Sequence, residues 1–359
     1  MSQVYVTGGR QRKAAENTEE EWTLYERALI VRLDTDTDRS ELAVDYVSPP
    51  EACAAGRPAF LFKSGSLRGG RLYVCTSTEV LIYEVPGFRR VGYISLPCFN
   101  DLHHVCPSRD GTLLVVSTGL DMVVEVSPDG RALRQWSVLG EDPWRRFSPD
   151  IDYRKVSTTK PHKSHPNFVF ELGDDIWVTR AVQGDAVCLT RPGLRIGLGK
   201  ELVHDGHFHG GKIYFTTVDG TLVIVGQDSL RVEQVVDLTT IDNDARALLG
   251  WCRGVMVLDE RRVWVAFTRV RKTRFKEHIN WVKHVFRDIE KPTHMALYDL
   301  EARTILNEID LERHGLNVVF SMLPAVSPRI VQQRRPDNDH GPAYAAGPRE
   351  AADARAPLG

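Results

Sequence analysis

Residues 203–220, which read VHDGHFHGGKIYFTTVDG, decide the fold. Three histidines and an aspartate come first, a Gly-Gly turn follows, and a β-branched and aromatic segment comes next, which is typical of two hairpin strands. The same order appears twice upstream, at residues 102–117 (LHHVCPSRDGTLLVVS) and 165–179 (HPNFVFELGDDIWVT). The recurrence indicates a repeat with polar side chains at one end of each unit.

From residue 58 onward, short strands bounded by Gly and Pro recur in sets of four. The predicted sets are 59–63, 71–76, 80–84 and 90–96; 104–108, 113–117, 122–126 and 133–138; 165–172, 176–180, 186–189 and 194–198; 204–209, 212–217, 221–226 and 233–238; and 254–258, 262–268, 293–298 and 304–309. A four-strand unit repeated every ~40 residues is the signature of an all-β propeller. A pair of irregular β-sandwiches is the alternative.

A last strand, at 316–322, has no successors. We expect it to form a sixth blade with N-terminal strands at 3–7, 28–33 and 41–47. The sequence therefore predicts a six-bladed β-propeller over residues 1–325, with seven blades as the alternative. Residues 326–359 are rich in Pro, Gly, Arg, Asp and Ala and are predicted to be a disordered tail.

The composition excludes several partner classes. The formal net charge of -2 gives no field that calls for nucleic acid, and no apolar run reaches the ~20 residues of a spanning helix. The N-terminus lacks the pattern of a signal peptide. Six scattered cysteines without a CxxC pair predict a cytoplasmic protein.

Two long segments interrupt the repeat. One is the link at 140–163, and the other is an insertion in blade 5 whose residues 273–288 have the spacing of an amphipathic helix with a basic face. In an up-and-down blade both connections lie at the end where first strands begin. We expect the helix to cover the channel mouth, or to contact a protein partner or a second copy.

The histidines that open first strands are the candidate metal ligands. His104 and His204 each lie nine residues before the first large apolar residue of the next strand, and His165 lies eleven before its counterpart. Equal parity places the three on one side, where three imidazoles would hold Zn or Fe. The alternative is that each is a buried hydrogen-bonding strut.

Further polar residues of the same strands are the candidate catalytic and substrate-binding groups. Arg253 would present a guanidinium to an anion at the channel mouth. The predicted catalytic residues are Arg253, Asp205 and His209, and the predicted substrate-binding residues are Asn167, His207 and Asn317.

The blade pattern resembles the broad six-bladed group of NHL-type and gluconolactonase-like propellers. In the gluconolactonase-like enzymes Glu, Asn and Asp hold a divalent ion, but residues 57–60 (RPAF) at the start of blade 1 contain no Glu. The peptidyl-hydroxyglycine lyase propellers hold zinc with three His from separate blades, and the resemblance implies that part for His104, His165 and His204.

These features predict an enzyme that acts on a small polar or anionic molecule by metal-dependent lyase, hydrolase or oxidative chemistry. The metal would polarise a substrate oxygen or activate a water. The alternative function is a non-catalytic binding propeller that docks partners through the basic inserted helix.

Overall fold

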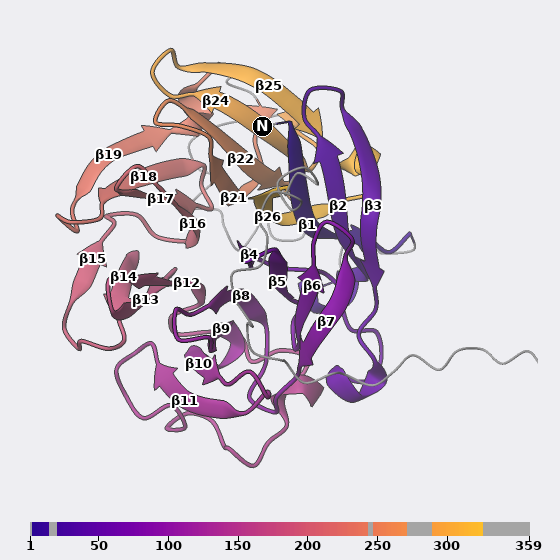
Figure 1. Ribbon diagram of the computed structural model, residues 1–359, viewed down its shortest axis with the longest axis vertical. Helices are drawn as coiled ribbons and strands as arrows, with labels where there is room; N and C mark the ends of the chain where they lie inside the picture. The colour runs from indigo at the N-terminus through magenta and orange to yellow at the C-terminus, as the bar shows by residue number, and fades with distance from the viewer. Residues whose placement is uncertain (1, 14–19, 243–246, 271–288, 326–359) are drawn as a thin grey trace, which may run out of the picture.

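The protein is a six-bladed β-propeller in a computed structural model that describes residues 2–13, 20–242, 247–270 and 289–325 (Figure 1). Each blade is a four-stranded antiparallel sheet, and the blades surround one axis. The six-bladed fold expected from the strand pattern and from the resemblance is thereby confirmed. The predicted inserted helix at 273–288 and tail at 326–359 lie outside the described residues.

Blades 1 to 5 follow one another along the chain. Blade 1 contains β4 (Gly65–Arg68), β5 (Arg71–Cys75), β6 (Val80–Glu84) and β7 (Arg89–Ile94); blade 2 contains β8 (Leu102–Pro107), β9 (Leu113–Ser117), β10 (Met122–Val126) and β11 (Ala132–Ser137); blade 3 contains β12 (Pro166–Leu172), β13 (Asp175–Arg180), β14 (Asp185–Cys188) and β15 (Arg195–Gly197). Blade 4 contains β16 (Val203–His209), β17 (Lys212–Thr217), β18 (Thr221–Gly226) and β19 (Val232–Asp237); blade 5 contains β21 (Trp251–Val257), β22 (Arg262–Thr268), β24 (His294–Asp299) and β25 (Thr304–Asp310).

Both ends of the described chain build blade 6. Its inner strand is β26 (Val318–Pro324), which pairs with β1 (Gln3–Gln11), and β2 (Tyr25–Asp34) and β3 (Arg39–Tyr46) complete the sheet. The predicted closure of the ring by both chain ends is therefore correct. A short helix, α1 (Glu21–Leu24), precedes β2, and the short strands β20 (Ala247–Leu248) and β23 (Ile289–Glu290) form a separate parallel pair.

One prediction about blade 1 was wrong. Residues 59–63 do not form its first strand, which is β4. Residues 60–62 instead bond to blade 6, where Phe60 N donates to Tyr25 O at 3.0 Å and Phe62 N to Gly8 O at 2.9 Å, and the chain returns to blade 1 at Lys63, whose N donates to Cys75 O at 2.8 Å. An apolar run in a sequence does not reveal which of two neighbouring blades it joins.

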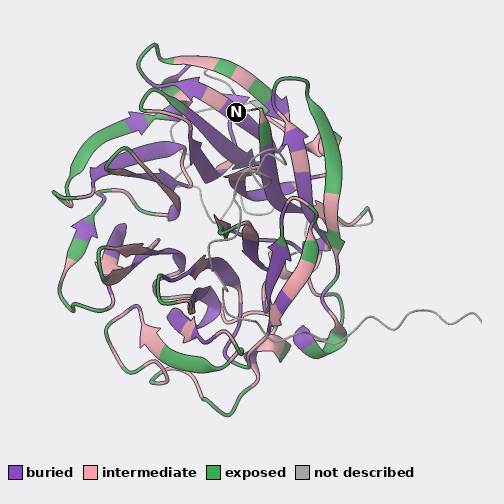
Figure 2. Cartoon of the chain, viewed as in Figure 1, coloured by how far each residue is buried: buried purple, intermediate pink, exposed green. Residues whose placement is uncertain are grey.

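Apolar side chains alternate along the strands, so each blade packs against both neighbours. In β17, Ile213 and Phe215 pack toward blade 3, whereas Tyr214 packs toward blade 5. The outermost strands β3, β11 and β19 are largely exposed, and the inner strands are buried (Figure 2). Within the described residues, no helix is long and apolar enough to span a membrane.

Candidate functional site: a ring of bulged residues around the axis

The inner strands of blades 2 to 5 share an irregularity at the same place. Pairing with the second strand shifts between Leu102 and Val105, Pro166 and Val169, Val203 and Gly206, and Cys252 and Val255. Such a β-bulge breaks the alternation of side chains and re-aims the bulged residue. The first bulged residues are His103, Asn167, His204 and Arg253, and all four line one cavity.

Blades 1 and 6 supply the corresponding positions. Phe320 is the extra residue of β26, between Val319 and Ser321, and Lys63 lies four residues before Leu67, as His204 does before Phe208. We call the six residues the axial ring: Lys63, His103, Asn167, His204, Arg253 and Phe320. Each blade therefore contributes one side chain.

Phe320 joins the members of the ring. Its centroid lies 5.8 Å from that of His204 and 6.2 Å from that of His103. The Arg253 guanidinium lies 4.2 Å from the same centroid, and Lys63 Nζ lies 5.8 Å from it. A phenyl face stabilises cations by its quadrupole, so Phe320 favours the close approach of both charged side chains.

A second tier of residues stands two positions before the ring in blades 2 to 4. Asp101, His165 and Leu202 all have left-handed backbone, with φ of 50°, 56° and 59°, and all three line the cavity. This conformation costs about 1–3 kcal/mol for a non-glycine residue. The surrounding contacts must therefore hold the chain in the turn that leads into each bulge.

The axial cavity has a volume of about 500 Å³. One part of its lining is polar: Glu20, Glu21, Asp101, His103, Lys160, His162, His165, Asn167, His204 and Arg253. The other part is apolar: Trp22, Pro161, Ala181, Val182, Leu202, Val218 and Trp251. This mixture, with a few convergent polar groups, is typical of a small-molecule site.

His103 is held as a neutral base. Its Nδ1 lies 2.9 Å from the Asp101 backbone oxygen, which can only accept, and 3.4 Å from Lys63 Nζ, which can only donate; the shorter contact assigns the proton to Nδ1 and leaves Nε2 bare. Burial and the neighbouring Lys63 ammonium keep the pKa of His103 well below its usual value. The buried Lys63 side chain itself forms an ion pair with the partly exposed Asp101.

His204 has the same tautomer. Its Nε2 accepts from Arg253 Nη1 at 3.1 Å, because a guanidinium only donates, so the proton is on Nδ1. Burial, together with the Arg253 charge, holds the pKa of His204 well below its usual value. Glu21 Oε1 lies 3.7 Å from Arg253 Nη2, so one carboxylate already approaches this guanidinium.

Asp121 fixes the loop that carries His165. Its carboxylate accepts from the backbone N–H groups of Lys163, Ser164 and His165 at 2.9, 3.0 and 2.8 Å, and from Arg146 Nη2 at 2.7 Å. The end of the long link at 140–163 is thereby tied to blade 2. This tie places His165 with its ring centroid 4.9 Å from that of His103.

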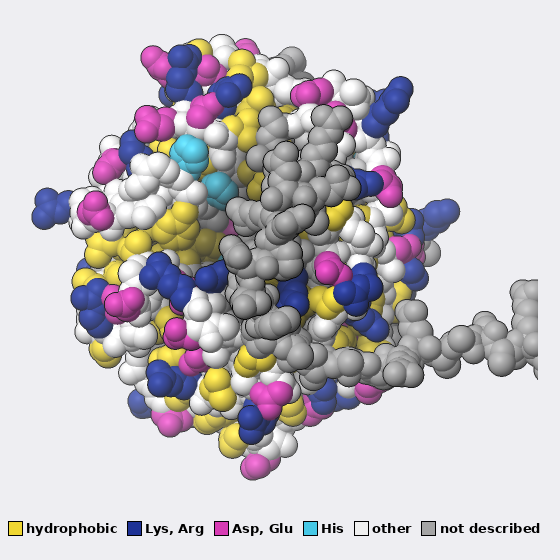
Figure 3. Space-filling view, in the orientation of Figure 1, with side chains coloured by type: hydrophobic (Ala, Val, Ile, Leu, Met, Phe, Trp, Pro, Cys, Tyr) yellow, Lys and Arg dark blue, Asp and Glu magenta, His cyan; other side chains and the backbone are white. Residues whose placement is uncertain are grey.

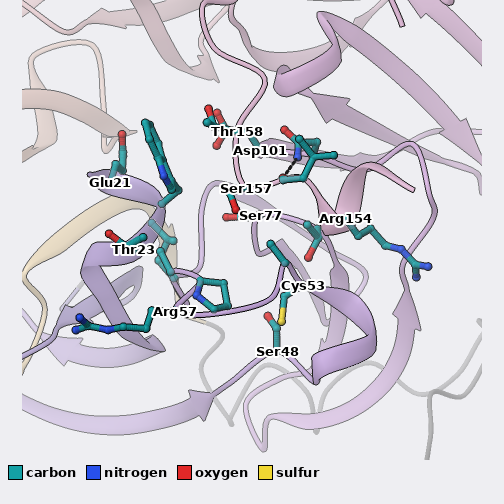
Figure 4. Close-up of a pocket in the computed structure, with 18 of the residues that line it drawn as sticks. Glu21, Thr23, Ser48, Cys53, Arg57, Ser77, Asp101, Arg154, Ser157 and Thr158 are labelled. Atoms are coloured by element: carbon teal, nitrogen blue, oxygen red, sulfur yellow. Dashed lines mark hydrogen bonds between the residues drawn. The ribbon is translucent and has the colours of Figure 1, made fainter. Parts of the chain in front are cut away.

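A smaller cavity of about 90 Å³ adjoins the axial cavity and shares Glu21, Trp22, Asp101 and Lys160 with it. Hydroxyl groups surround it, as Figure 4 shows for Thr23, Ser48, Ser77, Ser157 and Thr158. Arg154 lines it but is already bound bidentately to Asp152.

Three of the predicted site residues lie at the other end of the channel. His104, Asp205 and His207 line a separate cavity of about 460 Å³ with Phe168 and Phe208. Burial raises the pKa of Asp205 to about 7 and lowers the pKa values of His104 and His207 to about 4. In the view of Figure 3, charged side chains of both signs are interspersed among the described residues.

The predicted metal set is therefore not assembled. His165 and His204 reach the axial cavity, but His104 uses both nitrogens elsewhere: Nδ1 accepts from Val169 N at 3.3 Å, and Nε2 faces Ser66 Oγ at 3.3 Å. Within the part of the chain that the structure describes, no three or more His, Cys, Asp or Glu side chains are arranged to hold a metal ion. The Arg253 contact with His204 also disfavours a cation there.

A difference in turn length explains the misplaced histidine. Phe208 pairs with Ile213, whereas Pro107 pairs with Leu113, so the hairpin of blade 2 is one residue longer (213 − 208 against 113 − 107). Counting back from the second strand therefore selects His104 in place of His103. The counterpart of both ring histidines in blade 3 is Asn167, and His165 belongs to the second tier.

The remaining predicted residues divide between the cavity and the scaffold. Asn167 and Arg253 line the axial cavity, as expected for ligand-binding groups. Asn317 accepts a hydrogen bond from Gln11 N at 2.9 Å, which ties β26 to β1. His209 is the last residue of β16 and lines neither of the two channel cavities.

Sequence reasoning missed Lys63, His103, His162 and Phe320. His103 is adjacent to His104, which was predicted as a ligand in its place. An alignment of the repeats that allows for the bulge would have identified His103. Lys63 is the last residue of the segment 59–63, which was assigned to the wrong strand, and Phe320 carries no polar signal at all.

No protein-family model and no curated protein matches the sequence. Among solved structures, a protein of unknown function from Bacteroides caccae is similar, with a TM-score of 0.57 and 12% identity over 91% of this chain and 100% of that chain. A streptogramin B lyase gives a TM-score of 0.44 and 10% identity over 86% and 88% of the two chains. A catalytically inactive virginiamycin B lyase from Staphylococcus aureus gives 0.43 and 10% over 66% and 70%. These likenesses concern the fold alone.

Proposed function

We propose that the protein is an enzyme that binds a small anionic molecule in the axial cavity and transfers a proton on it, in a reaction of the lyase or hydrolase type. The observation that carries the proposal is the axial ring, in which the neutral base His103 and the cation Arg253 both lie against Phe320. A buried base beside an anion-binding group is a common catalytic combination.

Arg253 is the proposed anion-binding residue. Its guanidinium is buried, and the Glu21 carboxylate approaches it at 3.7 Å, which is longer than a direct hydrogen bond. A ligand carboxylate or phosphate that replaces Glu21 would gain bidentate hydrogen bonds. Glu21 therefore marks where the anionic group of the substrate would lie.

His103 is the proposed general base. Its bare Nε2 accepts a proton from the substrate, and the Nδ1–H bond to the Asp101 carbonyl keeps the ring oriented while it is charged. The proton then returns to the leaving group or to the product, so the enzyme ends unchanged. Proton transfer by a positioned side chain typically contributes ~10²–10⁴ in rate.

Thermal shift and calorimetry with acetate, benzoate and inorganic phosphate test the binding step. We expect one of these probes to bind, Arg253→Gln to weaken it at least about tenfold because a charged hydrogen bond is lost, and Glu21→Gln to tighten it. Arg313→Gln, which changes an exposed arginine, is the matched control. Binding that is indifferent to Arg253 would overturn the proposal.

Turnover of an anion that the wild-type protein converts tests the chemical step. His103→Gln should retain binding and lose turnover, whereas a saturating ligand that the wild-type protein returns unaltered would indicate a binding protein without catalysis. The predicted docking role of residues 273–288 lies outside the described residues, and the cytoplasmic location remains a prediction.

A further inference from the structure

We propose that His165 is a second proton-transfer group of the same site, and that Thr159 and His162 are positioning residues that keep its Nε2 unprotonated. The proposal rests on the proposed function for its chemistry, but it is derived from a chain of hydrogen bonds that exists without substrate. The chain runs from blade 2 through the long link to the axial cavity.

The chain begins at two groups that only accept. Thr159 Oγ1 donates to the backbone oxygen of Gly119 at 2.5 Å, and its other oxygen neighbour at 3.4 Å is Asn100 Oδ1. The Asn100 amide nitrogen donates to the Tyr153 and Val156 carbonyls at 2.8 and 2.7 Å, which fixes Oδ1 as an acceptor. The single hydroxyl proton of Thr159 is therefore used on this side.

The tautomers of both histidines follow from that assignment. His162 Nε2 lies 3.3 Å from Thr159 Oγ1, which has no proton left to give, so Nε2 of His162 carries the proton and donates. His162 Nδ1 is then bare and accepts from His165 Nδ1 at 2.9 Å. His165 is left with its proton on Nδ1 and a bare Nε2.

His165 is placed to use that nitrogen. It lines the axial cavity, and its ring lies edge-on to the His103 ring with centroids 4.9 Å apart. Burial, followed by the neighbouring His162, lowers the pKa of His165 to about 3, so the imidazole is neutral at ordinary pH. Asp121 holds the backbone of His165 in the left-handed turn that this placement needs.

The proton balance is simple. His165 Nε2 takes a proton from a substrate O–H, N–H or C–H bond, and the electron pair of that bond stays on the substrate. The resulting imidazolium keeps its Nδ1–H bond to His162, whose bare nitrogen holds the ring in the same orientation while it is charged. The proton then returns from Nε2 to the leaving group or to the product, so His165 ends neutral.

Long-range nitrogen–proton NMR of the histidine rings in the ligand-free protein tests the inference, because it separates protonated from bare ring nitrogens. We expect the wild-type protein to have His165 protonated on Nδ1 and bare on Nε2, with His165→Gln and His162→Gln assigning the signals. In Thr159→Val, His162 loses its acceptor, and we expect the His165 population with protonated Nε2 to rise several-fold.

Thr159→Ser keeps the hydroxyl and should restore the wild-type tautomer, which separates positioning from packing. A protonated Nε2 on His165 in the wild-type protein, or a tautomer that Thr159→Val leaves unchanged, would overturn the inference. Neither outcome depends on anion binding. A failure of the Arg253 experiment with the expected tautomers would therefore count against the proposed function and leave this hydrogen-bond chain intact.

Discussion

Asp121 shows how one side chain fixes the geometry of the site. It is 1% exposed, yet it accepts hydrogen bonds from three consecutive backbone N–H groups and from Arg146. A carboxylate is well suited to this because its two oxygens accept up to four hydrogen bonds. The residue that delivers His165 to the cavity is therefore in blade 2, far from His165 in sequence.

Asp121→Ala should lower the free energy of unfolding by about 2–4 kcal/mol, because it leaves buried N–H groups and Arg146 without an acceptor. It should also accelerate amide exchange at Ser164 and His165. Differential scanning calorimetry and hydrogen exchange measure the two effects. Asp174→Ala, at an exposed turn, is the control, and equal stability of the two variants would contradict this account of Asp121.

At the scale of the element, the seam between β1 and β26 has little room for a side chain. A Cβ added at Gly8 would lie 1.9 Å from the Val318 oxygen. Gly197, on the outer strand of blade 3, has nothing within 4 Å of such a Cβ. Substitutions of the two glycines therefore form a matched pair of variants that tests how much the closure of the ring contributes to stability.

Gly8→Ala should separate β1 from β26 locally and lower the free energy of unfolding by about 1–3 kcal/mol or more, as overpacking does. Gly197→Ala should change it by less than about 0.5 kcal/mol. Urea unfolding of the two variants measures the difference. Similar midpoints would mean that the seam relaxes easily and that closure contributes little.

The strand pattern was sufficient to predict the blades, because alternation with period two and the turn residues are local properties. Sequence reasoning also identified His165, His204, Asn167 and Arg253, since polar residues at the start of inner strands are conspicuous. It did not identify His103 or Lys63. A bulge and a one-residue difference in turn length reverse side-chain parity, and neither has a local signal in this sequence.

At the scale of the whole molecule, the buried histidines couple stability to pH. Burial holds the pKa values of His103 and His204 well below the usual one and lowers those of His104 and His165 to about 4 and 3. Unfolding restores the usual value near 6.5, so the unfolded chain binds more protons below that pH. The contribution of these histidines to the free energy of unfolding is complete above pH 6.5 and is lost as the pH falls toward their pKa values in the folded protein.

We expect the free energy of unfolding to fall by about 1.4 kcal/mol per histidine and pH unit between pH 6.5 and pH 4. The melting temperature should therefore fall steeply over this range. Asp205, whose pKa is raised to about 7, binds a proton in the folded state over this range and therefore opposes the loss of stability. Calorimetry across this range gives the slope, and His104→Gln should reduce it by about one proton. A flat profile would show that these histidines titrate normally in the folded protein.

The closure of blade 6 has a consequence for the order of events during synthesis. β26 is the last strand of the propeller to leave the ribosome, and it carries Phe320, against which Lys63, His103, His204 and Arg253 lie. Five blades can form while the chain is still growing, but the side chains around the axis then lack their common neighbour. A nascent chain that stops before β26 would therefore be largely folded while its axial ring is still incomplete, and the ring would be completed in a single late step.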